Sequence, residues 1–428
     1  MSPLENSVNH NYNNKGRAWE IRFTSIDTAR SLSQLAPPPA GRANLSNAAA
    51  LGQPDLVCLS HLRWNFVYQR PQHLLSRSAK NRRVFFVEEP IYSASTEWRL
   101  DVSIHESGVW VIVPHLSEGI SEETAQTAQQ AMLDDLFQAT EIRQYILWYY
   151  TPMAVSFTNH LKPLAVVYDC MDELSAFKGA HPALKANESQ LLKRANVVFA
   201  GGHSLYEAKQ HQHPNIHAFP SSIEKEHFAK ARNLAEEPAD QKDIPHPRLG
   251  FFGVIDERLD LELLRGIAEA KPNWHLVIIG PVVKIDTATL PTNPNIHYLG
   301  GKSYQELPAY VGGWDIAMLP FAINESTKFI SPTKTPEYLA AGKPVISTPI
   351  RDVVKPYGEK GLVRIASNVA EFVKCAEELL SESADRANWL SAVDAFLADN
   401  SWDNTWNEMQ GLIKSAIADR NQKAAVRS

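Results

Sequence analysis

The sequence predicts an α/β protein built from two doubly wound, Rossmann-like domains. Short continuous apolar runs, which are typical of parallel strands covered on both faces, alternate with stretches of helical length. The alternation occurs in two series, at 54–225 and at 248–400, and the charged, proline-containing segment 226–247 between them is the predicted linker. A chain of 428 residues is long enough to give each series its own hydrophobic core.

The first series defines the predicted N-terminal domain. Its expected strands are 56–59, 84–87, 146–150, 165–168 and 197–200, with helices at about 69–79 and 122–138 and a hairpin at 102–114. Open α/β sheets bind ligands at the carboxyl ends of their strands. The polar residues that follow these runs are therefore candidates for an active site.

The second series repeats the pattern in the predicted C-terminal domain. Its expected strands are 249–253, 275–280, 296–300, 316–320, 344–347 and 362–365, with helices at about 368–381 and 384–398. The remaining segment, 401–428, carries a helix whose large apolar residues follow a helical repeat: Trp402, Trp406, Met409, Leu412 and Ile413. Residues 1–53 are predicted to form an N-terminal extension, in which 19–23 is either a short strand or a docking segment.

Composition narrows the class of protein. The net charge of −6 gives no reason to expect a nucleic-acid partner. Three scattered cysteines have no metal-ligand spacing and are typical of a reducing compartment. No apolar run approaches the length of a membrane span, and the first residues lack the basic start and apolar core of a signal peptide. We therefore expect a cytoplasmic protein.

One stretch of the second series, SPTKTPEYLAAGKPVIST at 331–348, indicates a loop, a short helix and a buried strand. Ser331 and Thr333 are candidate helix caps. Lys334 would lie in the first helical turn, which is unfavourable for a cation unless an anion is nearby, and Glu337 would share its face. A cation for phosphate and a carboxylate for ribose suit a nucleotide-diphosphate site. An exposed helix with one lysine and one glutamate explains the spacing equally well.

The same stretch resembles the donor-site signature of GT-B glycosyltransferases of the family-four-like group, also called group 1. The matching letters are EYLAAGKPV at 337–345, preceded by the SPTK loop. The letters HLRW at 61–64 and QRPQHL at 69–74 resemble the opening of the N-terminal half in one branch of these enzymes. Together the similar regions cover roughly residues 55–415.

The resemblance implies a GT-B fold, with the nucleotide-sugar donor in the C-terminal domain and the last helix crossing back to the N-terminal domain. It implies that Glu337 binds the donor ribose. It also suggests assembly of cell-surface or exported polysaccharide, with a glycan or lipid-linked acceptor and peripheral contact at the inner face of the membrane. One departure stands out, because the family's usual pair is two glutamates separated by seven residues, and Phe329 occupies the earlier position.

The turn after the first strand of the second series supplies further donor-site candidates. Gly253 would let the backbone approach a diphosphate, and Arg258 would offer a planar, permanently charged fork to its oxygens. Alternatively, Arg258 is a solvated arginine in a polar turn, and Asp256 is as well placed to pair with it as to touch the substrate.

A general base that deprotonates an acceptor hydroxyl is expected in the N-terminal domain if transfer inverts the sugar configuration. Asp172 follows a predicted strand and is the first candidate, although capping of a helix explains it at least as well. His61 ends the first strand and is the second candidate, although a buried histidine without a catalytic role fits its position too.

The acceptor site is predicted from residues at the same edge. Trp64 offers a ring on which sugars stack, while Arg63 and Arg70 offer donors to hydroxyl groups; Arg70 is equally suited to a helix start. Glu173 lies beside the candidate base, and His203 opens a predicted helix after a glycine pair, where an ordinary helix N-cap is the alternative.

These features predict a hexosyltransferase-type enzyme that moves a sugar from a nucleotide-diphosphate donor, with a UDP-sugar favoured, to an acceptor hydroxyl. No Asp-x-Asp pair occurs in the sequence, so we expect neither a metal nor a separate cofactor. The sequence also lacks G-x-G-x-x-G and P-loop motifs. Two alternatives remain open, namely a sugar-nucleotide epimerase of the same fold and a non-catalytic nucleotide-sugar-binding assembly protein.

Overall fold

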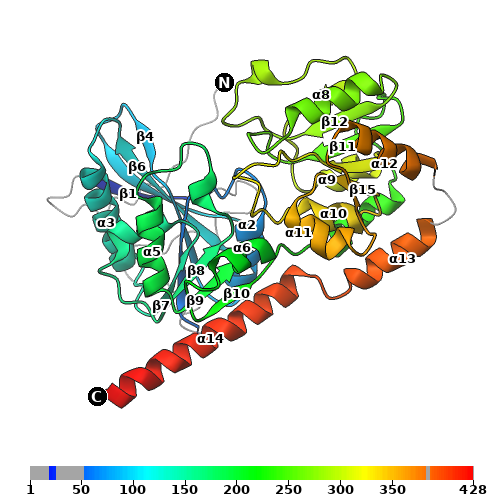
Figure 1. The fold of residues 1–428 in the computed structure, drawn as a ribbon. Coiled ribbons are helices and arrows are strands. Elements are labelled where there is room, and N and C mark those ends of the chain that lie inside the picture. The colour runs from blue at the N-terminus through cyan, green and yellow to red at the C-terminus, as the bar shows by residue number, and fades with distance from the viewer. Residues whose placement is uncertain (1–18, 26–52, 382–385, 428) are drawn as a thin grey trace.

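The computed structural model describes residues 19–25, 53–381 and 386–427, which form two α/β domains that lie next to each other (Figure 1). Each domain is built on its own sheet, as the two series of apolar runs predict. The α/β, doubly wound fold class is confirmed.

The N-terminal domain contains a 10-stranded sheet with the order β1-β5-β6-β3-β2-β7-β8-β9-β10, and β4 pairs with β6 outside this path. The bounds are β1 Trp19–Ser25, β2 Asp55–Ser60, β3 Val84–Glu88, β4 Ile91–Ser93, β5 Trp98–Ile104, β6 Val109–Ser117, β7 Tyr145–Tyr149, β8 Ala165–Cys170, β9 Val197–Ala200 and β10 Ile216–Ala218. The strand order reverses between β2 and β7, which makes the end of β2 a topological switch point. His61 directly follows that strand.

Helices cover both faces of this sheet. They are α2 Arg70–Ala79, α3 Glu122–Ala139, α4 Val155–Thr158, α5 Leu184–Arg194 and α6 His203–Lys209. Alternate residues of the central strands enter different hydrophobic clusters: Val57 packs in the cluster that includes Met132 of α3, and Cys58 packs in the cluster that includes Leu74 of α2. Double coverage explains why these strands are continuous apolar runs in the sequence.

Strand β1 pairs in parallel with β5, from Trp19 opposite Trp98 to Ser25 opposite Ile104. Residues 19–25 are therefore an edge strand of the N-terminal domain, which decides between the two predicted roles of this stretch. The remaining parts of the predicted extension, 1–18 and 26–52, lie outside the described residues.

The C-terminal domain contains a parallel sheet with the order β13-β12-β11-β14-β15-β16. Its strands are β11 Arg248–Phe252, β12 His275–Ile279, β13 Ile296–Tyr298, β14 Ile316–Leu319, β15 Val345–Ser347 and β16 Arg364–Ile365. Its helices are α8 Leu261–Ala270, α9 Leu307–Gly312, α10 Lys334–Ala340, α11 Arg351–Val353, α12 Val369–Ser381 and α13 Arg386–Phe396. The order reverses between β11 and β14, so this domain has its switch point at Gly253.

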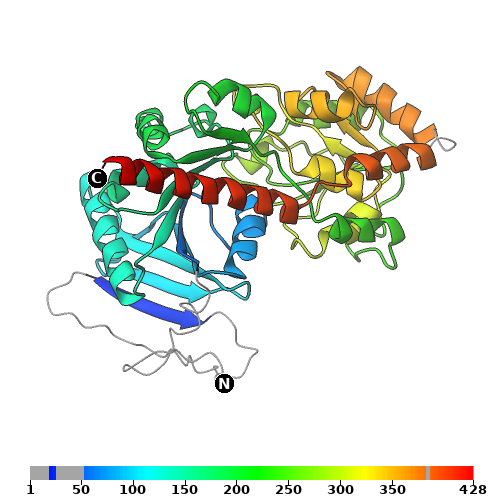
Figure 2. The same ribbon diagram turned by 90° about the horizontal axis from the view of Figure 1, so that it is seen from below.

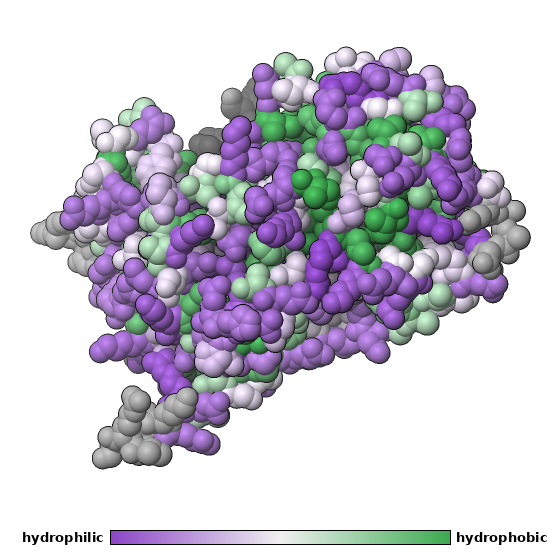
Figure 3. Space-filling view, in the orientation of Figure 1, coloured by the Kyte–Doolittle hydropathy of each residue, from purple (hydrophilic) through white to green (hydrophobic). Residues whose placement is uncertain are grey.

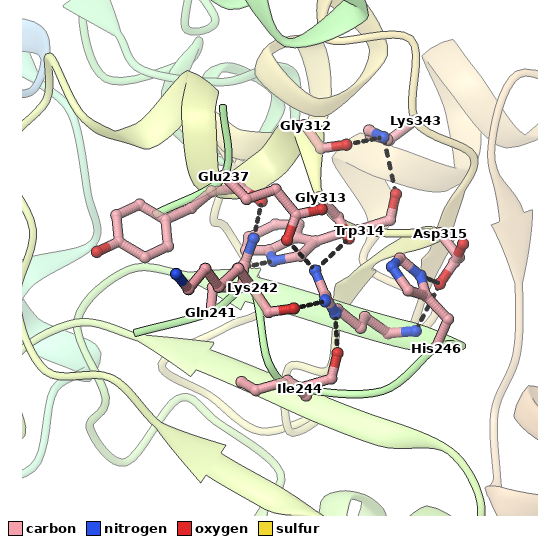
Figure 4. Close-up of polar contacts among 12 residues, drawn as sticks. Glu237, Gln241, Lys242, Ile244, His246, Gly312, Gly313, Trp314, Asp315 and Lys343 are labelled. Atoms are coloured by element: carbon pink, nitrogen blue, oxygen red, sulfur yellow. Dashed lines mark hydrogen bonds and ion pairs between the residues drawn. The ribbon is translucent and has the colours of Figure 1, made fainter. Parts of the chain in front are cut away.

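The segment predicted to be a linker packs against the C-terminal domain. It contains α7, Lys225–Ala229, and Phe228 of this helix lies in the core of that domain. Figure 4 shows the polar contacts that hold the rest of the segment. The buried guanidinium of Arg248 donates to the carbonyl oxygens of Ile244 at 2.6 Å and Gly313 at 3.2 Å, and it pairs with Glu237 at 2.6 Å. The segment is therefore part of the wall of the C-terminal domain and not a free linker.

The last helix, α14 at Trp402–Arg427, lies along the N-terminal domain (Figure 2). Trp402, Trp406, Met409 and Ile413 are buried in the hydrophobic cluster that also contains Leu74 of α2. This is the placement that the GT-B resemblance predicts for the final helix.

The face drawn in Figure 3 is mostly hydrophilic, with hydrophobic residues gathered over the C-terminal domain. Within the ranges that the structure describes, none of the helices has both the length and the apolar character needed to cross a membrane.

Candidate active site

Helix α10 forms the C-terminal side of the site. It begins at Lys334 after the loop that leaves β14. Thr333 already has helical backbone angles, with φ −55° and ψ −31°, and its side chain makes no capping hydrogen bond. The cap predicted at Thr333 is therefore wrong, and no side chain of the preceding residues covers the start of the helix by this kind of bond.

Two glycines make room for Lys334 at the ends of β11 and β12. At Gly253, where φ is +149°, a Cβ atom would lie 2.3 Å from Cε of Lys334. At Gly280, where φ is +147°, a Cβ atom would lie 1.8 Å from the carbonyl oxygen of Gly253. The Lys334 ammonium consequently lies 5.9 Å from the centroid of the Phe252 ring. Gly253 and Lys334 are thus close together, as expected if both contact the same donor.

Neither the Lys334 nor the Glu337 side chain forms a hydrogen bond or ion pair with another described residue, and Lys334 is only partly buried. The Glu337 side chain is buried, and burial raises the pKa of its carboxyl group to about 8, while the charge of Lys334 lowers it. Burial likewise lowers the pKa of the Lys334 ammonium, and Glu337 opposes that shift. Buried charges are normally paired. A lysine and a glutamate left unpaired at a strand edge indicate a site for a ligand that carries the missing partners.

Arg258 lies beside this pair but is already engaged. Its Nε and Nη2 atoms contact both carboxylate oxygens of Asp256, at 2.7 to 3.1 Å, which realises the alternative that the sequence left open for this pair. The guanidinium also lies 5.7 Å from the centroid of the Phe177 ring, which belongs to the N-terminal domain. Arg258 therefore stands at the meeting point of the two domains.

Asp172 faces these cations from the N-terminal domain. Burial raises the pKa of its carboxyl group to about 6, and the positive charges of Arg258, Arg70 and Lys334 act in the opposite direction. The loop that carries Asp172 is held against the other domain, because the Lys178 backbone amide donates to Glu257 at 3.0 Å. The structure thus brings the predicted base and the predicted donor residues together across the cleft.

His61 lies at the end of β2, and its Nδ1 atom is buried without a hydrogen-bond partner among the described residues. Burial lowers the pKa of the imidazole to about 4, and the positive charge of Lys284 in the other domain contributes to that shift. His61 is therefore neutral at neutral pH, and the charge that acts on it, that of Lys284, differs from those that act on Asp172.

Three of the predicted acceptor residues are structural instead. Arg70 is buried and forms hydrogen bonds with both oxygens of Asp169 at 2.9 to 3.1 Å, and it donates to the Phe219 carbonyl oxygen at 2.8 Å. Trp64 is only 3% exposed. Glu173 pairs with Lys209 at 2.7 Å and accepts from Ser175 at 2.6 Å. Their predicted acceptor roles do not fit, because none of these groups is free to contact a sugar.

Arg63 and His203 lie nearer the surface. Arg63 donates to Glu88 at 2.9 Å and to the Glu89 carbonyl oxygen at 2.6 Å. His203 is exposed at the start of α6, as predicted. The next amide of this helix, that of Ser204, donates to Asp352 of the C-terminal domain at 2.9 Å. The helix start at which His203 was predicted to contact the acceptor is thus occupied by a carboxylate of the chain itself.

Sequence reasoning missed the residues that join the domains. Asp352 lies 148 positions after Ser204, so only the folded chain shows the contact. A Cβ atom at Gly202 would lie 2.4 Å from Oδ2 of Asp352 and 2.8 Å from Cβ of Ser331. Phe329 packs against the core of the N-terminal domain, which gives it a role in the interface in place of the expected glutamate. The glycine pair at 201–202 was the signal for this close approach.

Comparison with known proteins finds a family match for part of the C-terminal domain. Residues 246–382 match the family model described as "Glycosyl transferases group 1". This segment is similar to a group 1 glycosyltransferase domain. The chain is also 25% identical over 280 residues to Bacillus subtilis TuaH, which is named as a teichuronic acid biosynthesis glycosyltransferase; the match covers 59% of this chain and 68% of TuaH. The glycosyltransferase function predicted from the sequence is confirmed at this level.

Solved structures confirm the GT-B architecture of the glycosyltransferase. Sucrose-phosphate synthase from Thermosynechococcus elongatus has a TM-score of 0.64 at 13% identity, covering 86% of this chain and 100% of that one. Anabaena HepE in complex with UDP and glucose has a TM-score of 0.59 at 10% identity, covering 85% and 100%. The trehalose-6-phosphate structure from E. coli with UDP-2-fluoro glucose has a TM-score of 0.62 at 12% identity, covering 85% and 99%.

Proposed function

We propose that this chain transfers a hexose from a nucleotide-diphosphate sugar, with a UDP-sugar favoured, to an acceptor hydroxyl without a metal ion. The observation that carries the proposal is the pair Lys334 and Glu337 at the start of α10. Glu337 is buried, Lys334 is partly buried, and neither side chain has a hydrogen bond or ion pair among the described residues, while the charge of Lys334 acts on Asp172. The structures of HepE with UDP and of the E. coli protein with a UDP-sugar analogue support the choice of nucleotide.

The diphosphate is the leaving group, and its developing charge needs stabilisation. Lys334 supplies a full positive charge, and the start of α10 adds the positive end of its helix dipole. Arg258 lies close enough to act on the same region electrostatically, although Asp256 holds two of its nitrogen atoms. These groups of the chain provide the charge that a metal ion supplies in metal-dependent enzymes. Glu337 binds the ribose hydroxyls.

Asp172 is the proposed general base. With a pKa of about 6 its carboxyl group is mostly ionised at neutral pH, yet basic enough to accept a proton from a hydroxyl in the transition state. The acceptor would enter on the N-terminal side of the cleft, between the loops that carry His61 and Asp172. The name of TuaH supports a glycan or lipid-linked acceptor in cell-surface polymer assembly. Such an acceptor would bring this cytoplasmic enzyme into peripheral contact with the membrane.

Ligand-dependent thermal unfolding tests the donor site. A nucleotide at about a hundred times its dissociation constant adds about 2.7 kcal/mol to the free energy of unfolding. We expect one of UDP, GDP and ADP to raise the unfolding temperature, and Lys334→Met and Glu337→Gln to abolish the rise. Lys328→Met and Glu325→Gln are matched controls, because both side chains are more than half exposed in the neighbouring loop. No rise with any nucleotide for a folded wild-type protein would refute the proposal.

The interface role of Phe329 leaves the donor sugar without the glutamate that the family usually provides. This observation favours keeping the epimerase and the non-catalytic binding protein as second candidates. Incubation with the preferred nucleotide-sugar separates the three. An epimerase converts the donor without an acceptor, a transferase releases nucleoside diphosphate when an acceptor is added, and a binding protein gives a thermal shift with no turnover.

A further inference from the structure

Tyr304 lies in the loop after β13, and aromatic rings from both domains hold it. Its ring stacks on Tyr68 of the N-terminal domain, with 4.7 Å between centroids and an interplanar angle of 26°. On another side it stacks on His227 of α7, at 4.4 Å and 11°. The imidazole Nε2 of His227 also contacts the Tyr304 carbonyl oxygen at 2.9 Å. These contacts fix the direction in which the hydroxyl group points.

The Tyr304 hydroxyl is buried and has no hydrogen-bond partner among the described residues. Burial raises the pKa of this hydroxyl, and the next cause is the negative charge of Glu337, which acts on it more strongly than Glu224 does. A buried hydroxyl without a partner costs about 1–3 kcal/mol. A group that is left unsatisfied beside the ribose-binding carboxylate is suited to a ligand that reaches both.

Ring contacts also connect Tyr304 with the donor lysine. Tyr304 packs edge-on against Phe228 at 5.7 Å, and Phe228 stacks on Phe252 at 6.0 Å. The ammonium group of Lys334 lies over the Phe252 ring. Tyr304 and Lys334 are therefore connected through these two rings, and Glu337 lies one helical turn from Lys334 on the same helix.

We propose that the Tyr304 hydroxyl is a further donor-site group, which donates a hydrogen bond to a ribose hydroxyl of the nucleoside diphosphate bound at Glu337. The inference rests on the proposed function, because it requires a ribose at Glu337. The ribose oxygen supplies the acceptor that Tyr304 lacks in the chain itself. Because Tyr68 covers one face of Tyr304, this contact also ties the occupied donor site to the N-terminal domain.

The test compares Tyr304→Phe with wild type in binding of UDP, GDP and ADP and of their 2′-deoxy and 3′-deoxy forms, measured by titration calorimetry. A neutral hydrogen bond contributes about 0.5–1.5 kcal/mol, or roughly 2- to 13-fold in affinity. We expect the wild type to lose this factor when one particular ribose hydroxyl is missing. Tyr304→Phe should bind the ribonucleotide weaker by the same factor and should no longer distinguish it from that deoxy form.

Tyr68→Phe is the matched control, because it removes a hydroxyl from the same stack and should keep the discrimination. The free Tyr304→Phe protein should unfold at the same or a higher temperature than wild type, since it loses an unsatisfied group. Discrimination by Tyr304→Phe equal to that of wild type, in a protein whose nucleotide binding depends on Lys334 and Glu337, would overturn the inference and leave the proposed function standing. Absence of nucleotide binding in the wild type would overturn both.

Discussion

Charged residues at the carboxyl ends of the strands are paired differently in the two domains. On the N-terminal edge, Arg70 is bound to Asp169, and Glu173 is bound to Lys209, which is itself held by Glu188. On the C-terminal edge, Arg258 is bound to Asp256, but the buried Glu337 and the partly buried Lys334 have no ion pair with each other or with any other described residue. The N-terminal edge thus pairs Arg70 and Glu173 and leaves Asp172 unpaired, while the C-terminal edge leaves Lys334 and Glu337 unpaired.

The difference shows how a scaffold charge is distinguished from a ligand-binding charge. A buried charge with a partner stabilises a fold only modestly, but the loss of one partner is expensive. A buried charge without a partner is tolerated where a ligand supplies the partner. Residue type alone would have placed Arg70 and Lys334 in the same class of cation, and their burial and their partners separate them.

The largest expected effect concerns Asp172, a carboxylate of the N-terminal edge on which the charges of Arg258 and Lys334 act. Asp172→Asn should reduce sugar transfer about 10²- to 10⁴-fold, because general-base catalysis contributes about that factor. The wild-type kcat/KM should rise with pH and level off above about pH 6, since the base must be ionised and burial raises the pKa of Asp172 to about 6. Asp172→Asn should lose this dependence.

Donor binding measured by thermal shift should survive Asp172→Asn, which separates catalysis from binding. Asp243→Asn is a suitable control, because Asp243 is exposed on the surface of the C-terminal domain. Full transfer activity in Asp172→Asn would remove the base assignment, make His61 the next candidate, and favour a retaining mechanism without a protein base.

The second prediction compares the two edges directly through stability. Arg70→Met should lower the free energy of unfolding by about 3–5 kcal/mol, because it leaves Asp169 charged and buried without its partner. Lys334→Met should leave the free energy of unfolding unchanged or raise it, because it removes a partly buried charge that has no ion pair among the described residues. Urea unfolding of the nucleotide-free proteins measures both changes.

Asp169→Leu combined with Arg70→Met should recover part of the lost stability, as expected when both members of a buried pair are replaced by apolar groups. A loss of several kcal/mol in Lys334→Met would show that this lysine has a structural partner, and the contrast between the two edges would then disappear.

The smallest expected effect concerns the exposed contact between the domains. Arg351 of the C-terminal domain pairs with Glu207 of α6, and half of the Glu207 side chain is exposed. Glu207→Gln should lower the free energy of unfolding by only about 0.2–1 kcal/mol, and high salt should erase the difference. A larger loss that persists in high salt would show that this surface pair, and not only the buried groups, holds the domains together.

The fold was predictable because double coverage by helices leaves a direct trace in the sequence. Runs such as 56–59 and 276–279 are apolar without alternation because both faces of the strand are buried. The segment 226–247 was misjudged for a related reason. Its charges suggest exposure, yet its apolar residues Phe228, Ala231 and Ile244 are buried in the C-terminal domain, and these scattered residues give no sustained periodic signal.

The candidate site was predictable only where it is local. The distance of three positions between Lys334 and Glu337 places them on one helical turn, and this can be read from the sequence. The partner of Arg70 lies 99 positions away, and that of Ser204 lies 148 positions away. Sequence spacing carries no information on such contacts, so the buried ion pair was mistaken for an acceptor contact. The cap at Thr333 failed because residue type cannot reveal that its backbone is already helical.

The bare backbone at Gly202 sets how closely the two domains approach. A methyl group at this position would lie 2.4 Å from Oδ2 of Asp352 and 2.8 Å from Cβ of Ser331, so the observed separation exists only because the side chain is a hydrogen atom. A larger side chain would act as a spacer between the domains, without touching Lys334, Glu337 or Asp172. The absence of a side chain at Gly202 thus helps to set how closely the two domains approach at this point.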